Sequence, residues 1–145
     1  MRNFLKIIGL LLLIISFNIT SYSKENFFNE ALELFKKEKY EDARFLFERN
    51  IVFNPKDAKS YLYLAKIYNF EENDIEEKKN IETVLLLDPK NEEANYMLME
   101  IELKKSNYIK VKELAENFPK ICNKLCNKKQ LILDSLKNLE PKNES

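Results

Sequence analysis

Apolar and polar side chains recur along the chain with the period of an α-helix. After Asp57, for example, apolar residues follow the spacing i, i+3, i+4 and i+7, which places them on one helix face. The residues with this spacing are Tyr61, Leu64, Ala65 and Tyr68. The pattern predicts an all-α chain. The predicted helices span residues 26–37, 40–53, 58–70, 74–87, 92–105, 108–117 and about 120–139.

Short polar residues mark where several of these helices begin. Asp57, Asn73 and Asn91 each stand directly before a predicted helix, where a side-chain oxygen can accept a hydrogen bond from a free backbone N–H group. Glu76 lies three residues after Asn73, the spacing of a capping box. Pro89 biases the residue before it away from helical geometry, and so predicts a helix end at that point.

The predicted helices recur in pairs with a period of 34 residues. Pro55 and Pro89 are 34 residues apart, each within a similar short string (Phe-Asn-Pro-Lys and Leu-Asp-Pro-Lys). The same interval separates Ala31 from Ala65, Phe27 from Tyr61, and Leu64 from Leu98. A repeat of this length is typical of stacked helical hairpins, which bury their apolar faces against one another.

The residues at these recurring positions resemble the tetratricopeptide repeat family over about residues 24–118. The first repeat has the family's aromatic, small and proline residues at Phe27, Ala31, Tyr40, Ala43, Phe47 and Pro55. The second has Tyr61, Leu64, Ala65, Tyr68 and Pro89, with Glu77 where a small residue is usual. The third repeat is degenerate: it keeps Leu98, Tyr108 and Ala115, with Met99 and Val111 at small-residue positions.

The resemblance implies a right-handed solenoid of three helix-turn-helix repeats over residues 24–57, 58–91 and 92–118. Pro119 stands four residues before the place that the period assigns to a third proline, which predicts a last repeat whose second helix is about one turn short. The apolar stripe that follows predicts a C-terminal capping helix within residues 119–140, covering the last repeat. The stripe consists of Ile121, Leu125, Ile132, Leu136 and Leu139. Residues 141–145 are expected to form a disordered tail.

Members of this family bind partners in a groove lined by the first helix of each repeat. The resemblance places nine residues there: Phe28, Leu32, Phe35, Leu62, Lys66, Asn69, Tyr96, Glu100 and Leu103. Family members that grip a C-terminal carboxylate use Lys and Asn where this chain has Phe28 and Leu32, so an apolar helix or extended peptide is the expected ligand. Two alternatives remain. The stripe Phe28, Leu32 and Phe35 either packs within the core, against the next repeat or the N-terminal segment, or mediates homodimerisation.

Cys122 and Cys126 lie four residues apart in the predicted capping helix. The chain has no His to complete a zinc site with them, so we predict no metal centre. Side chains at i and i+4 of a helix point in awkward directions for a disulfide. We therefore expect both thiols to pack as apolar groups. A disulfide formed at a local cost to the helix, and reactive or intermolecular chemistry, are the other two hypotheses.

Residues 1–23 have the features of a secretory signal peptide. Arg2 and Lys6 precede an apolar run over residues 7–17, and small residues follow at positions 21 and 23, as a cleavage site requires. As a helix this run spans about 16 Å, well short of the roughly 30 Å hydrocarbon core of a membrane. We expect an exported, periplasmic or extracellular bacterial protein with no membrane span after cleavage. An uncleaved membrane anchor is the alternative.

The composition argues against catalysis and against nucleic-acid binding. The chain has no His, and its only glycine is Gly9, so common general bases and glycine-rich phosphate loops are absent. Without Arg2 and Lys6, 22 basic residues face 24 acidic ones, a net charge of −2 that does not favour nucleic acid. The acidic pairs at 71–72 and 76–77 are expected on solvated helix surface.

Taken together, these features predict a non-catalytic protein–protein interaction module with no cofactor. Its expected role is assembly of a cell-envelope complex, and a self-associating structural subunit is the alternative. An enzyme or a ligand carrier is a further alternative, but the sequence offers no cluster of polar residues that would form a catalytic or ligand site.

Overall fold

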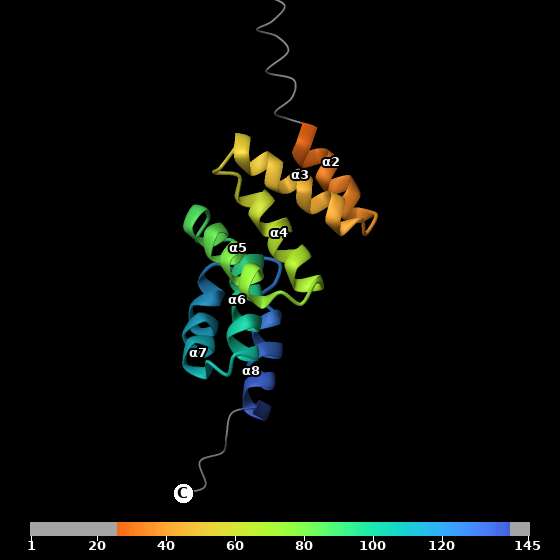
Figure 1. Cartoon of the computed structure of the whole chain (residues 1–145). Helices are drawn as coiled ribbons and strands as arrows, with labels where there is room; N and C mark the ends of the chain where they lie inside the picture. Colours follow the sequence, from red (N-terminus) through yellow and green to blue (C-terminus); the bar gives the residue numbers. More distant parts are fainter. Residues whose placement is uncertain (1–25, 140–145) are drawn as a thin grey trace, which may run out of the picture. The chain divides into compact units, whose positions relative to one another are not determined.

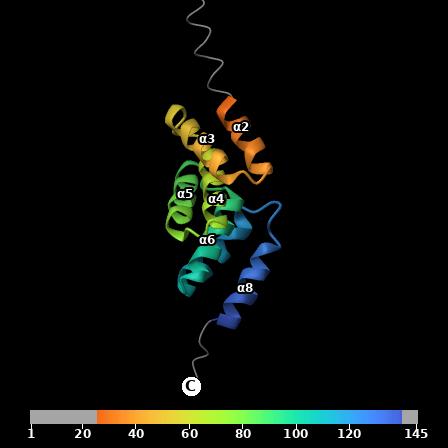
Figure 2. The same ribbon diagram turned by 45° about the vertical axis from the view of Figure 1, so that its right-hand side comes forward.

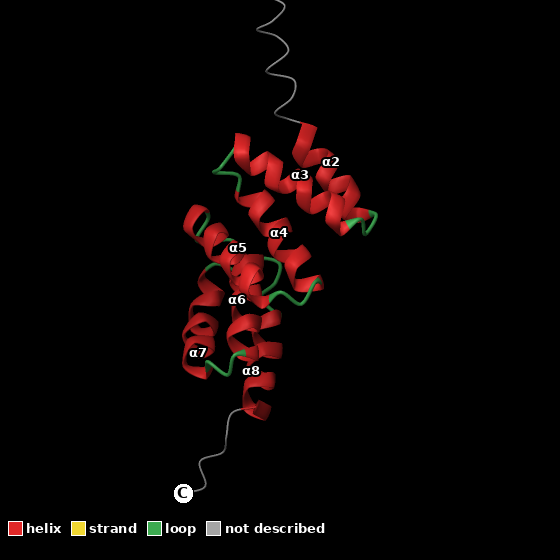
Figure 3. Ribbon diagram, viewed as in Figure 1, coloured by secondary structure: helices red, strands yellow, loops and turns green. Residues whose placement is uncertain are grey.

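The computed structural model describes the backbone of residues 26–139 and the side chains from Phe27 onward. The predicted signal peptide and the predicted tail over 141–145 lie outside the described residues. Within the described part, helices alternate with short loops and no strand is present (Figures 1 and 3). The all-α prediction is confirmed.

The helices coincide closely with the predicted ones. They are α2 (Asn26–Lys36), α3 (Tyr40–Phe53), α4 (Ala58–Phe70), α5 (Asp74–Leu87), α6 (Glu92–Lys104), α7 (Tyr108–Asn117), the 3₁₀ helix η1 (Phe118–Lys120) and α8 (Lys128–Leu139). The described residues divide into two compact units, which meet in the sequence between Pro55 and Lys56. Helices α2 and α3 belong to unit 1, and the other helices belong to unit 2.

The capping predictions hold at two of three helix starts. The side chains of Asn73 and Asn91 each accept a hydrogen bond from the backbone N–H three residues later, at 3.2 and 3.0 Å. Asn107 caps α7 in the same way, at 3.4 Å. Asp57 is a correction: it makes no side-chain cap bond to the helix backbone, and its carboxylate accepts instead from the Ser60 hydroxyl at 2.7 Å.

Each hairpin turns through a left-handed residue that is not glycine. Glu38, Glu72 and Ser106 have φ angles of 58°, 55° and 57° and lie 34 residues apart. In each turn the N–H of the left-handed residue bonds a carbonyl three residues back, and the next N–H bonds a carbonyl five residues back. This is the Schellman motif, in which a residue with positive φ ends a helix and satisfies its last carbonyls. The repeat period is therefore visible in the backbone itself.

In unit 1, helix α2 packs along α3 (Figure 1). Ala31 and Ala43 are completely buried, and their small side chains let the two backbones approach closely. At the open end of the hairpin the ring of Phe27 stacks on that of Phe53, with 5.8 Å between centroids. The guanidinium of Arg49 lies 4.4 Å from the centre of the Phe27 ring, a cation–π contact.

In unit 2, helix α6 contributes to two apolar clusters. The first joins α4, α5 and α6 and consists of Leu62, Ala65, Ile81, Val84, Ala94, Met97, Leu98 and Ile101. The second joins α6, α7, η1 and α8 and consists of Met99, Val111, Ala115, Phe118, Ile132 and Leu136. Met99 and Val111, which replace small residues of the family pattern, are both completely buried. Their larger side chains therefore fill the second cluster.

The last hairpin is shortened as predicted. Helix α7 has 10 residues, whereas α3 and α5 have 14 each. Pro119 lies within η1, which follows α7 directly, and Phe118 is buried in the second cluster. The chain then leaves the hairpin and returns as α8, which contacts both α6 and α7.

The start of the capping helix differs from the prediction. Helix α8 begins at Lys128, whereas the sequence predicted a helix from about residue 120. Residues 121–127 form a loop, visible in Figure 2 as the blue segment that leads into α8. Cys122 and Cys126 form a disulfide within this loop, with their Cα atoms 5.2 Å apart. The expectation of free thiols is thus overturned: the pair is bonded, and the local helix gives way to a loop.

No helix in the described range 26–139 is both long and apolar enough to cross a bilayer.

We predict that Glu72→Gly stabilises the chain. Glycine relieves the steric contact of a Cβ atom at positive φ, worth about 1–2 kcal/mol, but it also adds freedom to the unfolded chain. The net gain in the free energy of unfolding should be about 0.5–1 kcal/mol, measured by urea denaturation. Glu72→Ala removes the same side chain but keeps Cβ, so it should give no gain. Equal stabilities for the two variants would contradict the explanation.

Candidate functional site

The predicted groove residues of unit 1 lie partly against their own hairpin partner. Phe28, Leu32 and Phe35 are half-buried. The ring of Phe28 meets Phe47 edge to face at 5.6 Å, and Phe35 meets Tyr40 in the same manner at 5.5 Å. Both contacts join α2 to α3, so these two rings pack partly within their own hairpin. The role of these three residues in a partner groove stays a prediction.

The three predicted groove residues of α4 serve different purposes. Leu62 is only 9% exposed and belongs to the first apolar cluster, so it lies in the core and not on a groove surface. The ammonium of Lys66 pairs with the Glu93 carboxylate of α6 at 2.9 Å. Asn69 donates a hydrogen bond of 3.0 Å to Glu77 of α5. The polar side chains of α4 thus bind neighbouring helices of the same unit.

The three predicted residues of α6 lie together in a hollow beside α8. Tyr96, Glu100 and Leu103 line a space of about 260 Å³, which we call the α6–α8 hollow. Its other lining residues are Lys104, Leu131, Ile132, Ser135 and Leu139. The sequence reasoning missed the contribution of α8. The sequence did contain an indication of it: Leu131, Ser135 and Leu139 are spaced i, i+4 and i+8, which places them on one face of the last helix.

Hydrogen bonding fixes the polar side of this hollow. The hydroxyl of Tyr96 donates to the Glu100 carboxylate at 2.7 Å. Partial burial, together with this bond to a carboxylate, raises the pKa of Tyr96 to about 12, so its hydroxyl stays a neutral donor well above physiological pH. The ammonium of Lys128 lies 5.4 Å from the centre of the Tyr96 ring. Leu131 and Leu139 are each 55% exposed and leave the apolar side accessible.

Unit 1 has a larger depression, lined by residues of α2 and α3. It has a volume of about 520 Å³, and the sequence reasoning did not identify it. Its lining combines three carboxylates with apolar side chains: Glu30, Glu41, Asp42, Leu34, Phe45 and Leu46. Across the side chains from Phe27 to Leu139, acidic and Cys residues do not gather into a group that could hold a metal ion.

One member of the acidic pairs is buried, against the expectation of solvated surface. Glu77 is 1% exposed and stands where the family has a small residue in helix packing. Its Oε1 atom accepts from Asn69, while no partner for the buried Oε2 atom is found among the described residues. Burial raises the pKa of Glu77, although the bond from Asn69 opposes the rise. The carboxyl is therefore a destabilising feature when it is ionised.

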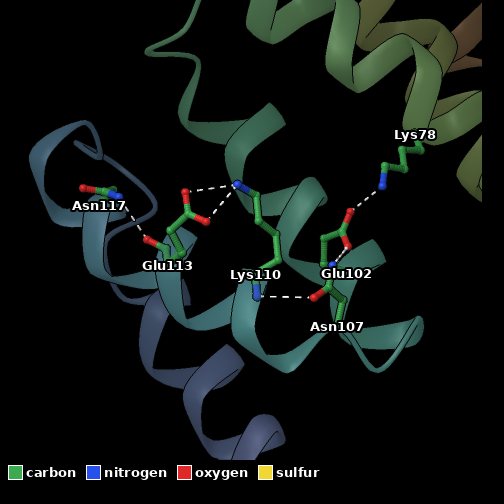
Figure 4. A network of polar contacts seen from close by, with 6 residues as sticks. All are labelled: Lys78, Glu102, Asn107, Lys110, Glu113 and Asn117. Carbon is green, nitrogen blue, oxygen red and sulfur yellow. Dashed lines mark hydrogen bonds and ion pairs between the residues drawn. The ribbon is translucent and has the colours of Figure 1, made fainter.

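A second buried acid is fully paired and joins three helices. Glu102 of α6 accepts from Lys78 of α5 at 2.6 Å and from the side-chain amide of Asn107 at 2.8 Å (Figure 4). Burial alone would raise the pKa of Glu102, but these two bonds outweigh it and hold the pKa below its ordinary value. The network continues along α7 through Lys110 and Glu113.

The fold is shared with solved tetratricopeptide repeat domains. The TPR2B domain of yeast Sti1, solved in complex with pHsp70, superposes with a TM-score of 0.72 at 15% identity, covering 81% of this chain and 98% of that one. The type III secretion chaperone SycD of Yersinia enterocolitica, solved with a peptide of the translocator YopD, superposes with a TM-score of 0.73 at 20% identity, covering 83% and 96%. SycD in an alternative dimer gives a TM-score of 0.66 at 22% identity, covering 83% and 96%.

These likenesses confirm the predicted fold. A scan against protein-family models found no match, and a search of the curated proteins found none either. The all-helical repeat architecture is therefore shown by structure, at sequence identities between 15% and 22% for these three structures of two proteins.

We predict that Lys78→Met destabilises the chain by about 2 kcal/mol, because Glu102 would remain buried without its cation. The low pKa of Glu102 means that the pair stabilises the fold above pH 4.5, the ordinary value, and that this contribution is lost as the pH falls through the lowered pKa. Urea denaturation at pH 7 and at pH 3 measures both effects. Lys79→Met, at an exposed neighbour that pairs with Glu76, should cost less than about 0.5 kcal/mol. Equal costs for the two variants would exclude a special role for the buried pair.

We predict that Glu77→Gln stabilises the chain at pH 7 by about 1 kcal/mol, because it removes a buried charge and keeps an acceptor for Asn69. The raised pKa implies that the wild-type chain loses stability as the pH rises from 4.5 through that pKa. The advantage of the variant should therefore vanish below pH 4.5. Glu76→Gln, next to it but less buried, is the matched control and should show no such pH dependence. A variant less stable than wild type at both pH values would refute the assignment.

Proposed function

We propose that the chain is a non-catalytic protein-interaction module that holds a partner peptide or helix against the first-helix surface of unit 2. In this proposal the α6–α8 hollow receives an apolar side chain of the partner. One observation carries this proposal. The hollow combines the half-buried aromatic ring of Tyr96 with Leu131 and Leu139, whose side chains remain about half exposed. Exposed apolar surface of this kind marks interaction sites.

The hollow suits one side chain of a peptide in size and chemistry. Burying a Leu or Phe side chain of the partner there would contribute about 1.5–3 kcal/mol to the free energy of binding. This is too little to hold a partner by itself, but it would anchor a peptide that makes further contacts. Glu100 and Lys104 add one charge of each sign to the lining. The solved complexes of SycD with a YopD peptide and of Sti1 with pHsp70 show that this fold accommodates such partners in other proteins.

We also propose that the protein acts outside the cytosol, in assembly of a cell-envelope complex. The support for export is the pattern of residues 1–23, with its basic start, apolar run and small residues. The Cys122–Cys126 disulfide agrees with it, because disulfides persist in oxidising compartments. The role in envelope assembly follows from the proposed export and the proposed binding together.

Self-association through the same hollow is the alternative function. Leu131 and Leu139 would then bury against a second copy. SycD, which shares the fold, has been solved as a dimer.

We predict that Leu131→Asp abolishes partner binding. A randomised peptide library displayed on phage and selected on the purified full chain should yield sequences with a shared apolar residue. Their affinity, measured by isothermal titration calorimetry, should fall at least about tenfold in Leu131→Asp, because a carboxylate replaces the apolar contact. Ile109→Asp places the same change at an 85% exposed residue of α7, outside the hollow, and should leave the affinity unchanged.

Light scattering of the chain without peptide separates the two functions. A monomer supports the peptide-binding module, whereas a dimer that Leu131→Asp dissociates supports self-association. Selected peptides that bind Leu131→Asp as tightly as wild type would refute the hollow as the site.

A further inference from the structure

We propose that the redox state of Cys122 and Cys126 determines where α8 begins and thereby whether the α6–α8 hollow is formed. The proposal rests on the proposed function, since it assigns a control to the same site. It concerns the loop over residues 121–127, whose sequence is suited to a helix and whose backbone is not helical.

The residues of this loop continue the apolar stripe of α8. Ile121 and Leu125 are spaced i and i+4, and both pack against the second apolar cluster together with the residues of α8. Pro119 stands where proline is well tolerated, in the first turn of a helix. The segment also contains no glycine. Local sequence thus favours one continuous helix from about residue 120 to Leu139, and something in the folded chain must prevent it.

The disulfide is the first restraint. Bonded cysteines have Cβ atoms about 3.8 Å apart, whereas residues at i and i+4 of a regular helix have Cβ atoms about 5–6 Å apart. The Cα atoms of Cys122 and Cys126 are 5.2 Å apart, which is also shorter than the about 6 Å that four helical residues span. A regular helix through both residues is therefore incompatible with the bond.

Glu92 is the second restraint. Its carboxylate accepts hydrogen bonds from the backbone N–H groups of Asn123, Lys124 and Leu125, at 2.6, 2.9 and 3.1 Å. These bonds hold the pKa of Glu92 below its ordinary value. In a helix that starts near residue 120, most of these N–H groups would instead bond carbonyls four residues back. The loop and a continuous helix are thus alternative states, and Glu92 stabilises the loop.

The loop over residues 121–127 contacts both helices that line the hollow: Glu92 of α6 holds its backbone, and its C-terminal end leads into α8. Glu92 is the first residue of α6, which supplies Tyr96, Glu100 and Leu103 to the lining. The loop ends at α8, which supplies the other wall. Seven residues added as helix would extend α8 by about 10 Å and turn it with each added residue. Because Phe118 is anchored in the core before the loop, α8 cannot keep its register on α6 in both states.

Formation of the bond is an ordinary thiol–disulfide exchange with a disulfide oxidant. One deprotonated thiol attacks the oxidant and forms a mixed disulfide; the second then displaces the oxidant's sulfur and closes the Cys122–Cys126 bond. Two electrons pass to the oxidant, which leaves as a dithiol, and the two protons come from the cysteine thiols. An exported chain would meet such oxidants after leaving the reducing cytosol. Binding would then become possible only after export.

The test compares the oxidised and the reduced full chain by hydrogen exchange and circular dichroism. Reduction with excess dithiothreitol should raise helicity by up to about seven residues, slow the exchange of amides 121–127, and change the exchange of α8. Cys122→Ser/Cys126→Ser should resemble the reduced chain and should not respond to dithiothreitol. An unchanged α8, or a segment 121–127 that loses protection without a gain in helicity, would overturn the proposal.

A matched pair of variants isolates the contribution of Glu92. Glu92→Gln should increase the helicity gained on reduction, because it weakens the bonds that hold the loop. Glu116→Gln, at an exposed residue of α7, should leave that gain as in wild type. Equal responses of the two variants would exclude Glu92 as a restraint on the loop.

Binding of the selected peptides completes the test. Their affinity should fall at least about tenfold on reduction, in parallel with the change in α8. A change in α8 without any change in affinity would refute the link to the hollow. The exchange and dichroism measurements need no peptide, so a failure of the proposed function and a failure of the switch remain distinguishable.

Discussion

The architecture of unit 2 depends on the burial of helix α6 on more than one side. Ala94, Leu98 and Ile101 face the cluster shared with α4 and α5, while Met99 faces the cluster shared with α7 and α8. Burial of each of the larger side chains, Leu98, Met99 and Ile101, contributes about 1.5–3 kcal/mol to stability. Because α6 belongs to both clusters, loss of either cluster would expose apolar surface on α6. The packing of α6 in the second cluster also positions α8 beside it, and these two helices line the hollow.

Three acidic side chains link separate elements of this unit. Glu102 accepts from α5 and from the cap of α7, so it requires both neighbours to be in place. Glu77 accepts one bond, from Asn69 of α4, and so links α5 to α4, although its carboxylate weakens the fold when ionised. Glu92 ties the first turn of α6 to a loop some thirty residues later. Loss of a partner of Glu102 would leave a buried carboxylate unpaired, which is costly.

The helices were largely predictable from sequence, because repeat spacing, proline and asparagine caps all agreed. The start of α8 was not, since local pattern favours a helix there while a disulfide and the distant Glu92 favour a loop. Residues 99–104 alternate apolar and polar positions, as a strand does, yet they are helical because α6 is buried on several sides. Of the predicted groove residues, Tyr96, Glu100 and Leu103 of α6 line the hollow, and their role in binding stays a prediction. Leu62 lies in the core instead, because one sequence cannot tell which apolar positions of a helix face the core.

The shortened α7 and the position of α8 also determine how far the array can extend. In repeat proteins an apolar face left open at one end invites end-to-end stacking with a further repeat or with another molecule. Here Ile132 and Leu136 of α8 occupy that face on α7, and residues such as Gln130, Asp134 and Lys137 of α8 are exposed. Within the described residues, a further repeat therefore cannot pack on the face of α7 that Ile132 and Leu136 already cover.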